Sequence, residues 1–146
     1  MIEWDLPGVH QIEVVVPAES IDLFGHVNNT EYLRFLEKVA WHHTQSLGLG
    51  WETYQRLNRA MVARRTEVDY LAPAYEAEKL LVGTWIVEND QRLTLVRRYQ
   101  IIRESDGLTL LRGRTRWVCV ALDSGKPRRM PPEFLAGYQI MANENE

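Results

Sequence analysis

Apolar residues recur with two different spacings along the chain, one typical of a helix and the other of strands. Between residues 29 and 47, apolar side chains recur every three or four positions and share one face of a helix about 18 residues long. Asn28 followed by Glu31 forms a capping pattern at its start, and Gly48 and Gly50 supply its end. The apolar face comprises Tyr32, Phe35, Leu36, Val39, His43 and Leu47.

Alternation with a period of two predicts strands before and after this helix. Turn-forming residues separate the later strands, and their close spacing favours antiparallel hairpins. Short helices are predicted over residues 51–57 and in the tail that begins at Pro131. The predicted strands cover residues 10–17, 61–72, 79–88, 93–104 and 108–122.

The predicted order is a strand, the long helix, four strands and a short helix. We expect a two-layer α+β domain in which a mainly antiparallel five-stranded sheet wraps around the long central helix. One domain covers residues 1–146, with residues 1–8 and 142–146 as loose ends. A second copy of the chain would cover the open edge of such a sheet, which predicts a homodimer or a homotetramer.

The last predicted strand, residues 108–122, has two faces of different polarity. Its arginines are expected to pair with acidic residues of a neighbouring strand, such as Glu67 and Asp69. Gly113 on the other face leaves room for a helix to approach the sheet. One face holds Leu111, Gly113, Thr115, Trp117, Cys119 and Ala121, and the other holds Arg112, Arg114 and Arg116.

Composition excludes several function classes. Lys plus Arg is 17 and Asp plus Glu is 20, a net charge of −3, whereas a dedicated nucleic-acid binder is usually basic. No apolar run approaches the roughly 18 residues that span a membrane, and the start of the chain lacks the features of a signal peptide. The single cysteine, Cys119, cannot form a disulfide within the chain or a zinc cluster, and we expect it to be buried. These features predict a soluble cytoplasmic protein without a metal site.

The segment from Ser20 to Asn29 combines three features of an acyl-transfer site. Asp22 is a carboxylate flanked by apolar residues, whose burial would strengthen it as a base. Gly25 permits a sharp turn, and the helix that follows Asn28 offers unpaired backbone N–H groups at the positive end of its dipole. A carboxylate opposite such groups provides a base or nucleophile together with an oxyanion hole. The same residues also fit an ordinary Asx-turn at Asp22 and an ordinary helix cap at Asn28.

The run from Asp22 to Tyr32, DLFGHVNNTEY, resembles the signature of the 4-hydroxybenzoyl-CoA thioesterase family, whose members have the hotdog fold. Residues 68–74 and 122–132 are more weakly similar to later parts of that family, so the resemblance covers most of the chain. It implies that Asp22 is the catalytic carboxylate and that the backbone N–H of Asn29 polarises the thioester carbonyl. It also implies dimers or tetramers with active sites at the subunit boundary.

His26 has two interpretations. In the related plant acyl-carrier-protein thioesterases, a similar H-V-N-N run carries a functional His with an Asn two positions before it. This chain has Phe24 at that position, which argues against the same triad. His26 therefore either orients water or substrate, or packs and caps the loop. The acyl pocket is expected along the helix, and the predicted substrate-binding residues are Gly25, Val27, Asn28, Tyr32 and Leu36.

Four cations late in the chain are candidates for binding the phosphates of coenzyme A, because guanidinium and ammonium groups suit phosphate oxygens. They are Arg92, Lys126, Arg128 and Arg129. The alternative is a solvated basic turn. No G-x-S-x-G elbow and no phosphate-binding glycine loop is present in the sequence, which argues against a serine hydrolase or a nucleotide-dependent enzyme.

We therefore expect an acyl-CoA thioesterase that releases a free acid and coenzyme A, with acyl-CoA as its partner and no cofactor. Asp22 acts either as a general base for water or as a nucleophile that forms a mixed anhydride. The alternative function is a non-catalytic acyl-CoA-binding or regulatory module of the same fold, which needs no basic carboxylate at Asp22. The acyl group, and the choice between coenzyme A and an acyl carrier protein as carrier, stay open.

Overall fold

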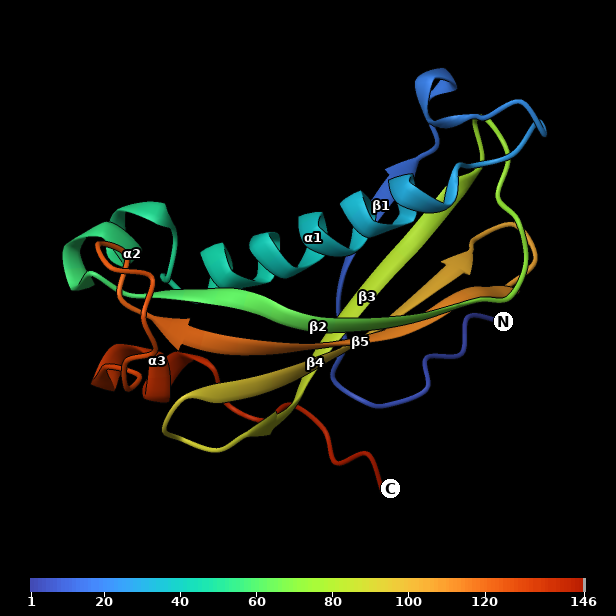
Figure 1. The fold of residues 1–146 in the computed structure, drawn as a ribbon. Coiled ribbons are helices and arrows are strands. Elements are labelled where there is room, and N and C mark those ends of the chain that lie inside the picture. The colour runs from blue at the N-terminus through green and yellow to red at the C-terminus, as the bar shows by residue number, and fades with distance from the viewer. Residues whose placement is uncertain (146) are drawn as a thin grey trace.

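The computed structural model describes residues 1–145 and places a long helix across a curved sheet (Figure 1). The sheet has five strands in the order β1-β3-β4-β5-β2, and every neighbouring pair is antiparallel. The α+β fold expected from the sequence is confirmed. The elements are β1 (His10–Val15), η1 (Ala18–Ser20), α1 (Asn29–Ser46), α2 (Trp51–Leu57), β2 (Ala60–Tyr70), β3 (Lys79–Asn89), β4 (Thr94–Arg103), β5 (Thr109–Val120) and α3 (Pro132–Gly137).

The predicted apolar face of α1 packs against the sheet. Val39 is fully buried in this core, and Leu36 lies 3.7 Å from where a Cβ atom on Gly113 of β5 would stand. A tighter contact at that position comes from the neighbouring strand, since the carbonyl oxygen of Glu67 would lie only 3.1 Å from the same Cβ. Gly113 therefore accommodates both the neighbouring strand and the helix.

The start of α1 differs from the predicted capping pattern. The side chain of Asn28 does accept a hydrogen bond from the Thr30 backbone N–H, so the cap itself is confirmed. Glu31, however, does not reach back to the N–H of Asn28, which donates instead to the carbonyl oxygen of Ser20. The Glu31 carboxylate binds the Ser20 hydroxyl over 3.0 Å and pairs with Arg34 over 2.8 Å. Glu31 thus ties the loop before α1 to the helix.

Loose ends were expected at residues 1–8 and 142–146, but Leu6 and Ala142 are buried; residue 146 lies outside the described residues. Both ends pack on the face of the sheet opposite α1 (Figure 1). Leu6 and Ala142 join Trp85 of β3 in a small core, and Trp4 packs edge-on against the Trp85 ring. The outer face of β3 is itself apolar here, so burial stabilises segments whose own sequence looks unstructured.

The expected pairing of the β5 arginines with Glu67 and Asp69 is also wrong. The register places Glu67 opposite Arg114 and Asp69 opposite Arg112, but the ion pairs run elsewhere. Arg112 binds both carboxylate oxygens of Asp5, over 2.7 and 2.9 Å. The other two outward arginines pair with Glu88 of β3, and Arg114 also pairs with Glu144. The terminal segments supply two of these acids, so sequence distance hid the partners.

The structure places the single cysteine in the interior. Cys119 is a free, buried thiol, and burial raises its pKa to about 11. No helix within residues 1–145 is long and apolar enough to cross a membrane. Among the same residues, no group of three or more His, Cys, Asp and Glu side chains is placed to hold a metal ion.

Candidate active site

The loop before α1 forms a tight turn around Asp22. The Asp22 N–H donates to the carbonyl oxygen of His26 over 3.0 Å, and the Gly25 N–H donates to the carbonyl oxygen of Asp22 over 3.0 Å. Gly25 has a φ angle of +85°, a left-handed conformation that glycine adopts without strain. The isolated bridge between Ile21 and Val27 closes the base of the turn. Asp22 is thereby held at the point where the chain enters α1.

The carboxylate of Asp22 has one hydrogen-bond partner among residues 1–145. Its Oδ1 atom accepts a hydrogen bond from the Phe24 N–H over 2.9 Å, which is the geometry of an Asx-turn. Leu23 and Phe24 extend into solvent, with Phe24 83% exposed, so they do not bury the carboxylate as the sequence suggested. Within the same described residues, Oδ2 of Asp22 has no hydrogen-bond donor. The residue as a whole is partly exposed, and one carboxylate oxygen is available to a ligand or to water.

The N-terminus of α1 adjoins this turn. Asn28 is the cap residue, and Asn29 is the first helical residue and is exposed. The backbone N–H of Asn29 has no acceptor in the described part of the chain, as expected for the first turn of a helix. Such an N–H, backed by the helix dipole, can donate to a carbonyl oxygen of a substrate. The two features that the sequence singled out, Asp22 and Asn29, thus belong to one junction.

A small cavity of about 250 Å³ lies beside this junction, between α1 and the end of β2. Tyr32 lines it and is fixed by a hydrogen bond of 2.9 Å that its hydroxyl accepts from the Ala74 N–H. Tyr70, which the sequence analysis did not single out, lines the other side and donates to the Asn29 carbonyl oxygen over 3.3 Å. The cavity is lined by His26, Val27, Asn29, Tyr32, Tyr70, Leu71, Ala72 and Pro73. Asp22 does not line it.

His26 lies at the rim of this small cavity. Its ring stacks on Phe24 with centroids 6.1 Å apart and meets Tyr75 edge-on at 6.4 Å. No hydrogen bond to its ring nitrogens is present among the described residues, so both interpretations of His26 remain predictions. Of the other predicted binding residues, Val27 is 1% exposed and lines the small cavity, whereas Gly25 and Asn28 shape the backbone of the loop.

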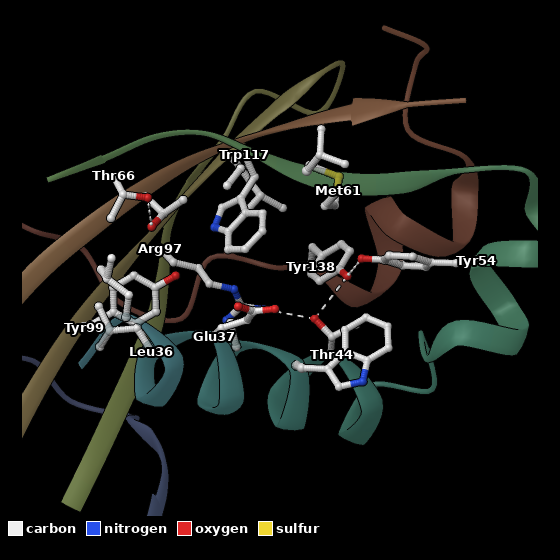
Figure 2. A pocket seen from close by; sticks show the side chains of 17 residues that line it. Leu36, Glu37, Thr44, Tyr54, Met61, Thr66, Arg97, Tyr99, Trp117 and Tyr138 are labelled. Atoms are coloured by element: carbon white, nitrogen blue, oxygen red, sulfur yellow. Dashed lines mark hydrogen bonds between the residues drawn. The ribbon is translucent and has the colours of Figure 1, made fainter. Parts of the chain in front are cut away.

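A larger cavity of about 500 Å³ lies between α1 and strands β2, β4 and β5 (Figure 2). Leu36, a predicted acyl-pocket residue, lines its end nearest to the Asp22 loop. Its polar lining includes Arg97, Tyr99, Thr44 and Tyr138, none of which the sequence analysis identified. Arg97 lies on the same face of β4 as Leu95, Tyr99 and Ile101. An arginine at an inward position of an otherwise apolar strand face could have identified it from the sequence.

Polar contacts organise the far end of this cavity. Arg97 donates from Nη1 to Nδ1 of His43 over 3.0 Å and from Nη2 to Oγ1 of Thr44 over 3.3 Å. The Thr44 hydroxyl also bonds the Tyr138 hydroxyl, which in turn bonds that of Tyr54 over 2.5 Å. Burial raises the pKa of both tyrosines, so both stay neutral. The end of the cavity is therefore a fixed network of neutral hydroxyl groups around one guanidinium.

The four cations predicted to bind coenzyme A lie together but far from Asp22 in the same chain. Arg92 and Met130 are joined by a backbone hydrogen bond of 2.8 Å, which brings the β3–β4 turn beside residues 126–129. All four cations are exposed and form no ion pair with the described acids. They lie near α2 and α3, whereas the Asp22 loop lies at the opposite end of α1 (Figure 1). At about 1.5 Å per residue, α1 separates the two regions by roughly 27 Å.

An antiparallel sheet wrapped around one long helix is the hotdog fold, which many thioester hydrolases share. Residues 15–137 match the family described as the Thioesterase-like superfamily. The chain belongs to this superfamily. The match is to the broad superfamily, so the finer assignment to the 4-hydroxybenzoyl-CoA thioesterases stays a prediction.

Individual relatives agree with this class. The chain is 26% identical over 125 residues to the long-chain acyl-CoA thioesterase FadM of Escherichia coli (strain K12), covering 85% of this chain and 92% of FadM. It resembles the crystal structure of Slr0204, a 1,4-dihydroxy-2-naphthoyl-CoA thioesterase from Synechocystis, with a TM-score of 0.80, 22% identity and coverage of 90% and 96%. It also resembles SAV2348 from Staphylococcus aureus in complex with CoA, with a TM-score of 0.82, 18% identity and coverage of 94% and 83%. These structures share the fold of this chain.

Proposed function

We propose that this protein hydrolyses acyl-CoA thioesters, with Asp22 as the catalytic carboxylate and the Asn29 N–H as the oxyanion donor. The observation that carries the proposal is the junction itself: within residues 1–145, Asp22 has a carboxylate oxygen without a donor in the loop that leads into α1, and the first N–H of that helix, on Asn29, has no acceptor. The relation to FadM, a long-chain acyl-CoA thioesterase, supports acyl-CoA as the substrate class. SAV2348, which shares the fold and whose structure holds CoA, supports a coenzyme A carrier.

In the proposed reaction, the thioester carbonyl oxygen accepts a hydrogen bond from the Asn29 N–H, which stabilises the negative charge of the tetrahedral intermediate. By one route, Asp22 takes a proton from a water molecule whose oxygen attacks the carbonyl carbon. By the other, the Asp22 carboxylate attacks and forms a mixed anhydride, which water then cleaves. In both routes the bond to sulfur breaks, and the products are a free acid and coenzyme A. The small apolar cavity beside Asn29 would receive the part of the substrate next to the carbonyl.

The exposed edge of the sheet supports the predicted assembly. β2 is an edge strand of 11 residues, and most of its residues are exposed. Val62 is 40% exposed and Tyr70 44%, although each lines one of the two cavities. Pairing of this edge with a second copy would protect it and close both cavities. A homodimer or homotetramer, and a cytoplasmic location, are therefore parts of this proposal.

A thiol-release screen tests the proposed activity. Acyl-CoAs of graded chain length and aromaticity are incubated with the protein, and free coenzyme A is measured with a thiol reagent. We expect at least one of these substrates to be hydrolysed with a kcat of roughly 1 s⁻¹ or more, as is usual for enzymes. Binding of acyl-CoA without release of coenzyme A across the whole series would instead favour the non-catalytic binding module.

Heavy-oxygen water tests for the anhydride route. In a single turnover with enzyme in excess, the general-base route places the heavy oxygen in the product acid. In the anhydride route, water that attacks the Asp22 carbonyl carbon places the label in Asp22, whereas water that attacks the acyl carbon places it in the acid. Label in the peptide containing Asp22, measured by mass spectrometry, therefore identifies the anhydride route.

A further inference from the structure

The larger cavity differs from an ordinary hydrocarbon pocket because its wall carries a buried guanidinium (Figure 2). Much of the lining is apolar, including Leu36, Trp41 and Leu95. Arg97 enters this lining from β4, and only 2% of the residue is exposed. The cavity therefore offers one fixed positive charge inside a site whose size and walls otherwise suit an apolar ligand.

Arg97 has no charged partner among residues 1–145. Its hydrogen bonds there run to neutral acceptors, Nδ1 of His43 and Oγ1 of Thr44. A guanidinium has five N–H donors, so these two contacts leave the majority without an acceptor in the described chain. Burial lowers the pKa of Arg97, but a guanidinium remains charged at neutral pH. The charge is thus buried and unneutralised.

The groups around Arg97 add further donors. Tyr99 and Thr115 line the same wall and are 2% and 3% exposed, and the Thr115 hydroxyl bonds that of Thr66 over 3.0 Å. The indole N–H of Trp117 is buried and has no acceptor in the described part of the chain. Hydroxyl and indole groups of this kind donate readily to an anionic oxygen. The wall is rich in hydrogen-bond donors, and within the described residues no carboxylate pairs with Arg97 or accepts from the Trp117 indole.

A buried charge without a partner destabilises a protein, and replacing it with an apolar residue is often neutral or stabilising. Its presence at a cavity wall is explained when a ligand supplies the missing anion. We propose that this cavity binds an acyl group whose far end carries a carboxylate, and that Arg97 holds this carboxylate. The inference rests on the proposed thioesterase function and specifies its substrate class: thioesters of dicarboxylic acids or of carboxy-substituted aromatic acids.

Glu37 is the acidic residue in the described lining of this cavity. Glu37 is exposed on α1, whereas Arg97 is buried. Glu37 and Arg97 form no ion pair within residues 1–145, so each charge can be removed separately. Removing the Glu37 charge should strengthen the binding of a carboxylate, whereas removing the Arg97 charge should weaken it.

The required length of the acyl chain depends on which protomer supplies the catalytic loop. Arg97 contacts Thr44, which lies about 20 Å along α1 from Asn29. A substrate bound by one protomer alone would need a long chain to span this distance. A loop supplied by a second copy at the exposed β2 edge would place the carbonyl nearer to Arg97. The substrate series must therefore vary the chain length.

The test compares matched pairs of acyl-CoAs that differ in a terminal carboxylate, such as adipoyl-CoA with hexanoyl-CoA and sebacoyl-CoA with decanoyl-CoA. We expect wild-type kcat/KM to favour the dicarboxylic member of at least one pair by roughly tenfold to a hundredfold, the usual effect of a charge-assisted contact. Arg97→Met should abolish this preference, so that the two members of each pair react with similar kcat/KM. Arg116→Met is the matched control, because Arg116 lies on the opposite face of the sheet and should keep the preference.

Binding of the free dicarboxylic acids, measured by calorimetry, separates this inference from the proposed function. Binding that Arg97→Met abolishes and Glu37→Gln strengthens supports the inference even if no thioester is hydrolysed. The exposed position of Glu37 keeps that second variant informative if Arg97→Met does not fold. A wild-type enzyme that hydrolyses thioesters but never favours a dicarboxylic chain overturns the inference and leaves the thioesterase function standing. The absence of both hydrolysis and diacid binding overturns both.

Discussion

Nη1 of Arg97 donates a hydrogen bond to Nδ1 of His43 over 3.0 Å, in the interior between β4 and α1. Nδ1 accepts a hydrogen bond only when it carries no proton, so the contact holds His43 in the neutral form with its proton on Nε2. Burial, reinforced by the positive charge of Arg97, lowers the pKa of His43 to about 3. Stability of the fold is thereby linked to pH.

We expect acid to destabilise the protein through His43. In the unfolded chain His43 has a pKa near 6.5, whereas in the folded chain its pKa is about 3, so the unfolded state binds the additional proton in between. The contribution of His43 to the free energy of unfolding is complete above about pH 6.5. It declines as the pH falls, by up to about 1.4 kcal/mol per pH unit. Urea unfolding at several pH values between 7 and 4 measures this slope.

His43→Asn isolates that effect, because an amide oxygen can accept from Arg97 but does not titrate. The unfolding free energy of this variant should depend less on pH than that of the wild type, because the variant lacks the proton, nearly one, that His43 takes up on unfolding. Burial also lowers the pKa of His10, whose ring packs against that of His43, so some acid sensitivity should remain. Identical slopes for variant and wild type would show that His43 is not the linked group.

Gly83 should be needed for the packing of the N-terminal segment. A Cβ atom there would lie 2.6 Å from the Trp4 ring and 2.6 Å from Val9. We therefore expect Gly83→Val to displace the segment and to destabilise the protein by about 1–3 kcal/mol, the usual range for overpacking. In a chain that lacks residues 1–9, the same substitution should have much less effect. Equal losses in both chains, measured by urea unfolding, would contradict the observed packing.

The cations predicted to bind coenzyme A should affect KM for acyl-CoA. If Arg128 and Arg129 bind phosphates of coenzyme A, changing both to Gln should raise KM for acyl-CoA more than tenfold and leave kcat nearly unchanged, because such contacts are equal in ground and transition states. A short thioester that lacks the nucleotide should react equally well with both proteins. Equal KM values on acyl-CoA would indicate a solvated turn and would favour another carrier site.

The assembly should be visible in solution. The exposed β2 edge predicts a mass of at least two chains by light scattering at micromolar concentration. Active protein with the mass of one chain would show that each site is complete within a single copy.

The spacing of apolar residues was sufficient to predict most of the fold. The helix and the strands follow from the spacing of apolar residues, because each period reflects one element packed against one core. The burial of Trp4 and Leu6 could not be predicted in this way, since it depends on an apolar outer face of β3 that lies far away in the sequence. The partners of Arg112 and Arg114 were missed for the same reason: Asp5 and Glu144 lie near the two ends of the chain.

In the candidate site, too, residues close together in the sequence were predictable and distant ones were not. Asp22, Gly25 and Asn29 are close in sequence, so a motif and the start of a helix were enough to place them together. Arg97 belongs to a cavity formed by elements that lie far apart in the sequence. Its inward direction becomes visible only when the alternation along β4 is followed from Leu95 to Tyr99. The expected burial of Asp22 by Leu23 failed because apolar residues in a short exposed turn have nothing to pack against within the chain.

Thiol release by Asp22→Asn tests whether Asp22 is the catalytic carboxylate. The substitution preserves shape and removes the base or nucleophile, so kcat should fall at least ~10²-fold, while affinity for a non-hydrolysable acyl-CoA analogue stays nearly unchanged. Glu19→Gln is the matched control, because Glu19 is an exposed carboxylate in the same loop with no ion pair in residues 1–145, and it should retain wild-type activity. An Asp22→Asn protein that keeps most of its thioester hydrolysis would contradict the account, because the carboxylate would then be only a turn residue.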